Sequence, residues 1–396
     1  MKTILILLSA LMLIPLVSAI ECSSERSQCN VTSALTLPEL HTALIAIQSD
    51  LSVNLSNGKP CHYVINTSIG VIDGGELTIE GCTLEFASPA AGWRTFSIDD
   101  GGILIINNSN ITSYIKTDTA NYNFYSLSGS TLTLKNSYID YTGTADSDLK
   151  RGLTIASDNL IFDNITMKHN SVLYSLVLKS EGLQIQNSDI SGSASDNIII
   201  SNSSMRIVNT SIYDEGAGRY NIIVYTDMNV TLLNSSYEDD AGLYPGAKLF
   251  KAWFYHIKVN DTSGNLLEGI TVTAHNKDSE LIDSKTTNSN GIAYMELTEY
   301  LETSGGKTYY SNYTITASRG DYGSGSLDVN VTGNDYDDYI TLELQPPDII
   351  VRYDDGDDTV HIPKDYIERI DDNTIGITVP RNVFVKFVIW LRSWAS

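Results

Sequence analysis

Apolar and polar residues alternate in a short phrase that returns along the first 240 residues of the chain. Its clearest copy is LQIQNSDI at residues 183–190, with apolar residues at the first, third and eighth positions and Asn at the fifth. Alternation with a period of two is the pattern of a β-strand that buries one face. Seven copies align, and their fifth positions are Gly81, Asn108, Asn136, Asn164, Asn187, Asn209 and Asn234.

The regular spacing of these copies predicts a solenoid. Successive fifth positions are 27, 28, 28, 23, 22 and 25 residues apart. Repeats in the twenties are typical of folds in which each unit stacks only on its neighbours. A second strand-like run occurs in many copies, and no copy has room for a connecting helix. We therefore predict an all-β chain in which residues 20–245 form about seven to eight coils of a parallel β-helix.

The repeated rungs, between about residues 65 and 240, resemble the right-handed parallel β-helix (pectin-lyase-like) family. The segment before them, residues 36–51, is predicted to be a helix, because Thr36 is a candidate N-cap and Pro38 follows it closely. The resemblance implies that this helix closes the N-terminal end of the coil and covers a strand edge that would otherwise be open.

The Asn at the repeated fifth position predicts a tight corner between two strands. Asn tolerates the left-handed backbone of such corners better than most residues. When coils stack, each corner amide can donate to the next, so we expect a ladder of side chains. A structural role is favoured over a catalytic one, because chemistry does not need a reactive group at every turn. The predicted ladder consists of Asn108, Asn136, Asn164, Asn187, Asn209 and Asn234.

A second domain is predicted after the Gly- and Pro-bearing junction at residues 241–253. Turn sequences at 261–264 and 288–291 separate alternating strands, with about seven strands expected in residues 254–345, the size of a sandwich. The pattern resembles the carboxypeptidase-regulatory-like Ig-type domain, which implies a non-catalytic spacer or an adhesive module that binds sugars or proteins. The residues that carry this resemblance are Val259, Asp261, Gly264, Leu267, Gly269, Val272, Thr287, Asn290 and Gly291.

Residues 1–19 have the layout of a secretory signal peptide, with one Lys, an apolar run and small residues before a cut after Ala19. A membrane anchor is the alternative, although the apolar run is short for the roughly 20 residues that a bilayer requires. We therefore expect a secreted or surface-displayed protein without a transmembrane span in its mature chain.

The four cysteines, Cys22, Cys29, Cys61 and Cys82, all lie near the mature N-terminus. An even number in a secreted protein indicates two disulfides, for which three pairings exist. We favour Cys22–Cys29 with Cys61–Cys82. A metal site is disfavoured, since no CxxC pair or His cluster accompanies these cysteines.

Thirteen N-x-Ser/Thr sequences predict a glycoprotein. Asn66, Asn164, Asn209 and Asn234 qualify only because the rung places a hydroxyl two residues on, and an amide held in a ladder is not expected to carry a glycan. The sites expected to be glycosylated are Asn30, Asn54, Asn107, Asn110, Asn202, Asn229, Asn260, Asn312 and Asn330.

The last segment, residues 346–396, is acidic and ends in an apolar stretch. A solvated acidic turn is the favoured interpretation of its clustered carboxylates. The alternative is a calcium site, with calcium as the one possible cofactor, formed by Asp354, Asp355, Asp357 and Asp358. As a strand, the stretch from residue 383 is a final core strand, a strand donated to a neighbouring subunit, or an interfacial membrane segment. Its assembly face would consist of Val383, Val385, Phe387, Ile389 and Leu391.

The net charge of −23 argues against a nucleic-acid partner. Many proteins of the resembled β-helix family are polysaccharide lyases or hydrolases, so we searched the coil for carboxylates and a base. The paired-Asp and Gly-His-Gly signatures of polygalacturonase-like members are absent. The candidates are Asp73, Asp99, Asp100, Asp140 and Asp163, with Lys150, Arg151, Lys168 and His169 as partners.

The sequence hypothesis is therefore a secreted, glycosylated, non-catalytic protein that serves adhesion, envelope architecture or filament assembly. Its partners would be glycans, surface proteins or copies of itself. The alternative is a carbohydrate-active enzyme that uses the β-helix face. Because fold alone does not determine function, the arrangement of the candidate residues has to separate the two.

Overall fold

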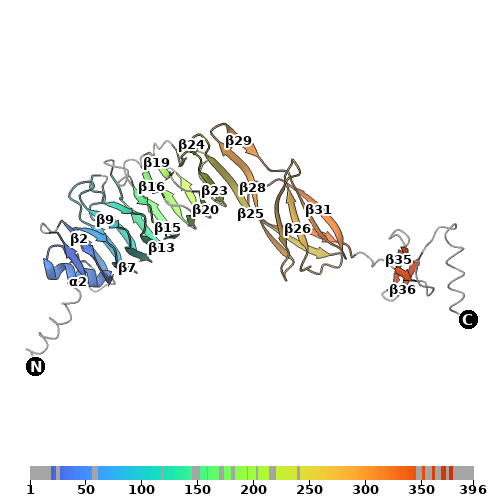
Figure 1. Cartoon of the computed structure of the whole chain (residues 1–396), viewed down its shortest axis with the longest axis horizontal. Helices are drawn as coiled ribbons and strands as arrows, with labels where there is room; N and C mark the ends of the chain where they lie inside the picture. The colour runs from blue at the N-terminus through green and yellow to red at the C-terminus, as the bar shows by residue number, and fades with distance from the viewer. Residues whose placement is uncertain are drawn as a thin grey trace, which may run out of the picture. The chain divides into compact units, whose positions relative to one another are not determined.

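The structure is a computed structural model of the whole chain, which divides into two compact units (Figure 1). It describes residues 19–344 apart from 24–26, 56–60, 118, 145–151, 158, 169–173, 180–182, 194, 202–203, 214–219 and 239–240, together with the backbone of four short strands beyond residue 349. The first unit is Met1–Phe254 with Glu296–Ser311 and Asn330–Asn334. The second is Tyr255–Met295, Asn312–Val329 and Asp335–Ser396.

One long sheet of the first unit takes one short strand from each coil. Its strands pair in parallel from β2 onward, whereas β1 is antiparallel to β2. In order, they are β1 (Ile20–Cys22), β2 (Gln28–Val31), β6 (Ser68–Val71), β9 (Thr95–Ile98), β12 (Asn123–Ser126), β14 (Leu153–Ile155), β16 (Tyr174–Leu178), β19 (Asp196–Ile200), β22 (Ile222–Val224) and β24 (Ala241–Leu243).

The predicted rungs form the rest of the coil, with one parallel ladder before the corner residue and another after it. Before the corner lie β3 (Ala34–Thr36), β7 (Glu76–Glu80), β10 (Ile103–Asn107), the first part of β13 (Thr131–Asp140) and of β15 (Asn159–Lys168), β17 (Gln184–Gln186), β20 (Met205–Val208), β23 (Asn229–Leu233) and the start of β25 (Lys248–Asp261). After it lie β5 (His62–Ile65), β8 (Thr83–Phe86), β11 (Asn110–Ser113), the ends of β13 and β15, β18 (Asp189–Ser191) and β21 (Ser211–Tyr213). The predicted parallel β-helix is confirmed.

Alternation along each rung decides which side chains fill the coil. Leu104 and Ile106 of β10 are fully buried and pair in register with Leu132 and Leu134 of β13, which are fully buried too. The same apolar positions recur in the neighbouring coils, so each side chain stacks on its equivalents above and below. Burial of a Leu or Ile contributes roughly 1.5–3 kcal/mol, which makes this continuous column the main stabilising feature of the coil.

The helix α2 (Leu37–Ile47) lies at the N-terminal end of the coil (Figure 1), a little shorter than predicted. Leu37, Leu40 and Leu44 are fully buried in the same apolar core as the rungs. The carboxylate of Glu39 accepts hydrogen bonds from the backbone N–H and the hydroxyl of Thr36, both at 2.7 Å, which fixes the first turn. A strand, β4 (Ser52–Asn54), follows the helix and pairs antiparallel with β5.

Both predicted disulfides are present. Cys22 and Cys29 face each other in the antiparallel pair of β1 and β2, and Cys61 is bonded to Cys82 across 21 residues of sequence. The bonds hold the first strands of the coil together at the end where it begins.

The second unit is built of strands as well. An antiparallel sheet runs in the order β27 (Leu281–Thr286), β26 (Thr271–His275), β30 (Tyr313–Arg319) and β31 (Gly323–Val329). The end of β25 pairs in parallel with β32 (Asp335–Leu342). The strand β28 (Ile292–Thr303) begins in this unit, and its hairpin with β29 (Gly306–Tyr309) lies in the stretch 296–311 of the first unit. An Ig-type assignment stays a prediction. Two stretches of the predicted second domain (residues 254–345), namely 296–311 and 330–334, belong to the first unit.

Two antiparallel strand pairs follow, β33 (Ile350–Arg352) with β34 (Thr359–His361) and β35 (Ile367–Asp371) with β36 (Thr374–Ile377). The predicted signal peptide up to residue 18, the acidic residues at 354–358 and the apolar stretch from 383 lie outside the described residues. In the part of the chain that the structure describes, no helix combines the length and apolarity needed to cross a membrane.

Candidate functional site: the corner columns and the closed end of the coil

The corner residues have the backbone that the sequence predicts. Gly81 has φ 62°, and the six corner asparagines have φ between 48° and 55°. A weaker copy of the phrase at residues 62–69 has Asn66 at its fifth position, but Asn66 is not a corner, because His62 pairs in register with Thr83, beyond the corner. The side-chain oxygen of Asn66 accepts a hydrogen bond from Arg94 at 2.8 Å. Asn therefore supplies a left-handed corner without the flexibility of Gly.

Three links of the expected ladder join one corner asparagine to the next. The Nδ2 of Asn164 donates to Oδ1 of Asn136 at 2.9 Å, that of Asn209 to Asn187 at 3.1 Å, and that of Asn234 to Asn209 at 2.8 Å. These side chains lie on the outer surface of the coil. The ladder therefore ties consecutive coils together from outside.

Elsewhere the corner amides choose a different acceptor, which departs from the expectation of one unbroken ladder. Asn108 donates to Oε1 of Glu80 at 2.8 Å, because the corner below it is Gly81, which has no side chain. Asn136 donates to Asn107 at 3.1 Å, and Asn187 donates to Asp163 at 2.8 Å. Each of these acceptors directly precedes a corner, and the two carboxylates are stronger acceptors than an amide oxygen.

A second column, made of hydroxyls, runs inside the corner. The residue after each corner Asn is buried, and at every corner except Asn164, which Ile165 follows, its hydroxyl accepts a backbone N–H from the preceding coil. For example, Cys82 donates to Ser109, Ser109 to Ser137 and Thr210 to Ser235, each at 3.1 Å. Each hydroxyl donates in turn to the carbonyl two residues earlier in its own coil, as Ser109 does to Asn107 at 2.7 Å. Buried polar groups are thus satisfied from coil to coil.

A further asparagine column was missed by the sequence reasoning. Asn123, Asn197 and Asn221 are buried at the start of strands of the first sheet. Asn197 donates to Asn221 at 2.8 Å, and Asn221 donates to the carbonyl of Tyr237 at 3.0 Å. The signal was an Asn placed directly before an apolar run in each of these coils.

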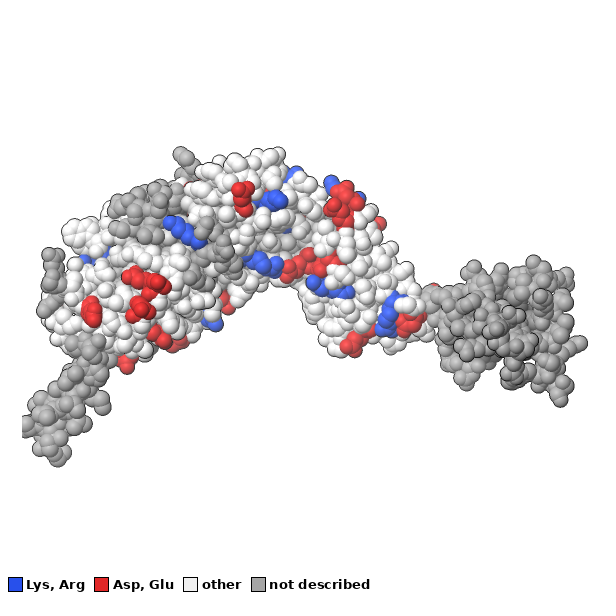
Figure 2. Space-filling model, viewed as in Figure 1, with Lys and Arg blue, Asp and Glu red and all other residues white. Residues whose placement is uncertain are grey.

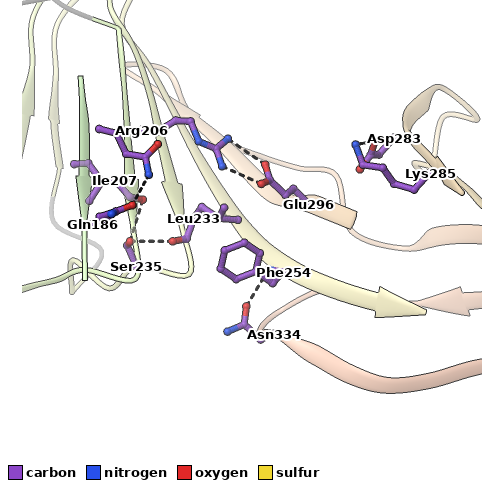
Figure 3. A network of polar contacts seen from close by, with 11 residues as sticks. Gln186, Arg206, Ile207, Leu233, Ser235, Phe254, Asp283, Lys285, Glu296 and Asn334 are labelled. Atoms are coloured by element: carbon purple, nitrogen blue, oxygen red, sulfur yellow. Dashed lines mark hydrogen bonds and ion pairs between the residues drawn. The ribbon is translucent and has the colours of Figure 1, made fainter. Parts of the chain in front are cut away.

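At the last coil, residues from later in the chain replace the missing next coil (Figure 3). Asn334 donates to Oδ1 of Asn234 at 2.7 Å and accepts the backbone N–H of Phe254 at 2.9 Å, so it acts as one more rung of the outer ladder. At the same end, the buried ammonium of Lys251 donates to the backbone carbonyl of Ser235. In earlier coils the equivalent carbonyl accepts a backbone N–H of the next coil, as that of Ser109 does from Tyr138, so Lys251 replaces this donor at the last coil.

A cluster of two tyrosines, a glutamate and a lysine connects the β28–β29 hairpin to the last coil. The Tyr237 hydroxyl lies 2.7 Å from the Tyr300 hydroxyl and donates to Glu302 at 2.7 Å. Burial, followed by these hydrogen bonds, raises the pKa of Tyr237 well above its usual value, so it stays a donor at all physiological pH. Lys307 lies 3.9 Å from the Glu302 carboxylate, which keeps the buried charge paired.

The outer face of the last coils carries a small apolar patch and is joined to β28 by an ion pair. Val208, Leu233 and Ala252 form a small buried cluster against Phe254. Arg206 donates to both carboxylate oxygens of Glu296, at 3.0 and 2.9 Å (Figure 3). A two-pronged pair of this kind fixes orientation as well as distance.

The candidate catalytic carboxylates are only partly brought together. Asp73 and Asp100 occupy equivalent turns of adjacent coils, and each carboxylate lies against the glycine of the next turn. A Cβ added to Gly101 would be 2.2 Å from Oδ1 of Asp73, and one added to Gly129 would be 1.7 Å from that of Asp100. Burial raises the pKa of the neighbouring Asp99. These carboxylates support turns of the coil.

The remaining candidates lie elsewhere on the coil. Asp140 and Lys168 are register neighbours of β13 and β15 beyond the corner, whereas Asp163 lies before it. Lys150, Arg151 and His169 lie outside the described residues.

One mixed column of charge was not anticipated. Glu80, Asn107, Lys135 and Asp163 follow one another in register on adjacent strands. Adjacent strands are about 4.8 Å apart, so the two carboxylates are separated by roughly 14 Å. Glycosidase carboxylates lie about 5–9.5 Å apart, so this column does not have the geometry for hydrolysis.

The structure also sorts the predicted glycosylation sites. Asn54, Asn110, Asn229, Asn312 and Asn330 are exposed, and Asn202 lies outside the described residues. The other three, Asn30, Asn107 and Asn260, are half-buried and accept hydrogen bonds only through Oδ1.

The three ladder sites, Asn164, Asn209 and Asn234, instead donate through Nδ2, the atom to which a glycan would be attached. Among the described residues, no group of three or more His, Cys, Asp or Glu is arranged to hold a metal ion. Charged side chains on the face in Figure 2 form small separate groups.

No protein-family model and no curated protein matches the chain. Among solved structures, a match is found to the crystal structure of the periplasmic alginate epimerase AlgG, with 14% sequence identity and a TM-score of 0.37. The match covers 52% of this chain and 64% of the epimerase chain. The activity in that title is a property of the epimerase.

Proposed function

We propose that this chain is a secreted or surface-displayed, glycosylated and non-catalytic protein, with the parallel β-helix as a stalk for an adhesive or assembling C-terminal part. The observation that carries the proposal is the use of the coil's repeated polar residues. They hydrogen-bond from coil to coil, Asn334 adds the last link of the asparagine ladder, and Lys251 donates to the backbone carbonyl of Ser235 at the same end. A coil that is closed in this way is suited to bear load and to hold another module at a distance.

Two further features support an extracellular setting. The disulfides Cys22–Cys29 and Cys61–Cys82 persist only where thiols are oxidised. The exposed sequons are spread over both units, as expected of a chain that carries glycans at its surface. Assembly would use the apolar stretch 383–391 as a strand donated to another copy.

The experiment compares the full chain with a chain that lacks residues 383–396, by electron microscopy and by assays for new reducing ends or unsaturated products on acidic and neutral polysaccharides. We expect no product from either chain, and particles longer than one copy only for the full chain. Sustained product formation would overturn the non-catalytic proposal. Single particles from both chains would overturn assembly through this stretch.

A carbohydrate-active enzyme is the second candidate, and one observation favours it. Asp73 and Asp100 occupy equivalent positions on adjacent coils, about 5 Å apart by the spacing of neighbouring strands, which is the separation in retaining glycosidases. If products form, Asp73→Asn and Asp100→Asn should each abolish them, with Asp163→Asn as a control on another face. Activity that survives both changes would remove this pair from consideration.

A further inference from the structure

The second unit carries a group of outward-facing side chains, which we call the tyrosine face: the exposed Tyr294 of β28, Tyr336 and Tyr339 of β32, and the half-buried His256 and Lys258 of β25. The tyrosines are 52%, 44% and 64% exposed, respectively. The alternate residues of the same strands, Ile257, Val259, Met295 and Ile340, are buried in the unit. The tyrosine face is therefore the outer side of strands whose inner side is already packed.

The rings of this face hold one another in place. The His256 ring lies between two tyrosines, with its centroid 4.5 Å from that of Tyr294 and 4.5 Å from that of Tyr336. Tyr339 is the register neighbour of Lys258, whose ammonium lies 3.6 Å from the carboxylate of Asp337. A tyrosine has only two side-chain torsions, and contact with a neighbouring ring restricts them further, so binding here would cost little conformational entropy.

The charge of the face limits what it can bind. Its one cation, Lys258, is paired with Asp337, so an anionic ligand would find no net positive charge. The three carboxylates of β32 beside the face already have partners: Asp337 pairs with Lys258, Asp335 accepts the backbone N–H of Asp337, and Asp338 accepts the Tyr255 hydroxyl. A second copy of this chain would bring another net charge of −23, which opposes association at low ionic strength. The ligand that fits is therefore uncharged.

The side chains of the face are apolar along their rings and polar at their tips. A tyrosine offers a flat ring to apolar C–H groups and a hydroxyl to polar ones. Burial lowers the pKa of His256, so at neutral pH its imidazole has one donor and one acceptor nitrogen. Pyranose sugars combine an apolar C–H face with a rim of hydroxyls, which is the complement of such a surface. An aliphatic peptide would leave the polar tips unpaired.

We propose that the tyrosine face is a binding site for a neutral oligosaccharide, whose sugar rings stack on Tyr294, Tyr336 and Tyr339 while its hydroxyls bond to the tyrosine, His256 and Lys258 polar groups. This inference rests on the proposed adhesive function and gives it a ligand class. It places recognition on the sheet surface of the second unit and needs no residue of the coil. Catalysis by the coil would neither support nor exclude it.

The test is calorimetric titration of the full chain with neutral hexasaccharides of glucose, mannose and galactose, and with an acidic hexauronide for contrast. We expect binding of at least one neutral probe and none of the hexauronide. Tyr294→Ala and Tyr339→Ala should each weaken binding about tenfold, which corresponds to about 1.4 kcal/mol, because each removes a ring on which a sugar stacks. Tyr114→Ala, at a 52% exposed tyrosine of the coil, should leave affinity unchanged.

The outcomes separate this inference from the proposed function. Binding that is insensitive to Tyr294→Ala and Tyr339→Ala would overturn the site while leaving an adhesive protein intact. Preference for the hexauronide would overturn the ligand class. If sedimentation shows self-association that Tyr339→Ala abolishes, the face binds a second copy, and the sugar proposal fails. Circular dichroism of each variant would show that the fold is retained, because these side chains lie on the surface.

Discussion

A corner asparagine contributes both a backbone conformation and a link of the ladder, and substitutions at Asn209 separate the two. Its φ is 50°, its Nδ2 donates to Asn187 at 3.1 Å, and its Oδ1 accepts from Asn234 at 2.8 Å. Two exposed hydrogen bonds contribute together about 1 kcal/mol. Alanine in a left-handed conformation costs a further ~1–2 kcal/mol. Asn209→Ala should therefore lower the free energy of unfolding by about 2–3 kcal/mol.

Two other substitutions at Asn209 divide that total. Asn209→Gly loses the same hydrogen bonds and relieves the backbone strain, but it adds about 0.5–1 kcal/mol of chain entropy, so its loss should be about 1.5–2 kcal/mol. Asn209→Asp keeps the acceptor and the tolerance for this conformation and loses only the donor, so it should lose about 0.5–1 kcal/mol. The expected order of destabilisation is Ala, then Gly, then Asp.

Urea unfolding followed by circular dichroism measures the free energies, and native-state hydrogen exchange shows where the loss falls. Faster exchange is expected for the corner amides of Asn187, Asn209 and Asn234. Asn312 is the matched control, because it is exposed, has φ 78° and lies outside the ladder. Asn312→Ala should show the strain alone, about 1–2 kcal/mol, and Asn312→Gly should show only the chain entropy, about 0.5–1 kcal/mol. The reasoning is refuted if Asn209→Ala and Asn209→Gly are as stable as the unaltered chain, or if corner exchange is unchanged.

Three further outcomes are expected. Lys251→Met keeps the length of the side chain but removes the donor to the backbone carbonyl of Ser235, so urea unfolding should show a loss of about 1.5–3 kcal/mol. No loss would mean that this carbonyl does not need the Lys251 donor. Replacing both Cys61 and Cys82 by Ser opens a loop with a sequence separation of 21, which should lower the free energy of unfolding by about 3 kcal/mol. The melting temperature should fall accordingly, and an unchanged melting temperature would contradict this expectation. Hydrogen bonds from Thr36 lower the pKa of Glu39 in the folded chain, so the ionised carboxylate stabilises the fold at pH values above its unfolded pKa. This stabilisation is lost as the pH falls through the pKa that Glu39 has in the folded chain. Glu39→Gln should therefore flatten the acid side of a plot of stability against pH, and an unchanged plot would refute the stabilising role of Glu39.

The fold of the coil could be predicted because its information is local and repeated. Each rung has its own alternation of apolar and polar residues, and its fifth residue marks the corner. The corner positions from Asn108 to Asn234 could therefore be predicted before any contact was known. The favoured disulfide Cys22–Cys29 follows similarly from two cysteines that a short antiparallel turn brings opposite each other. These features depend on neighbours within one or two coils.

The closed end of the coil could not be predicted because it joins residues that are far apart in sequence. Asn334 meets Asn234 across 100 positions, and Tyr237 meets Tyr300 across 63. No periodicity marks Asn334 as a rung, since it lies in a loop between strands of the other unit. The hydrogen bond from Asn187 to Asp163, in place of one to the preceding corner asparagine, could not be predicted for a different reason. Which of two nearby oxygens accepts an amide N–H depends on distances that a sequence pattern does not contain.

The division between repeated and unrepeated residues indicates where recognition can evolve. A change at a corner alters hydrogen bonds to the coils above and below, so these positions are constrained by stacking whatever the protein binds. The outward-facing residues of the strands in the second unit are not constrained by stacking, because their inward-facing neighbours already form the packed core. The tyrosine face, with Tyr294, Tyr336 and Tyr339 exposed over a packed core, is therefore free to be selected for a ligand. Half-exposed aromatic residues in such positions are better explained by binding than by stability.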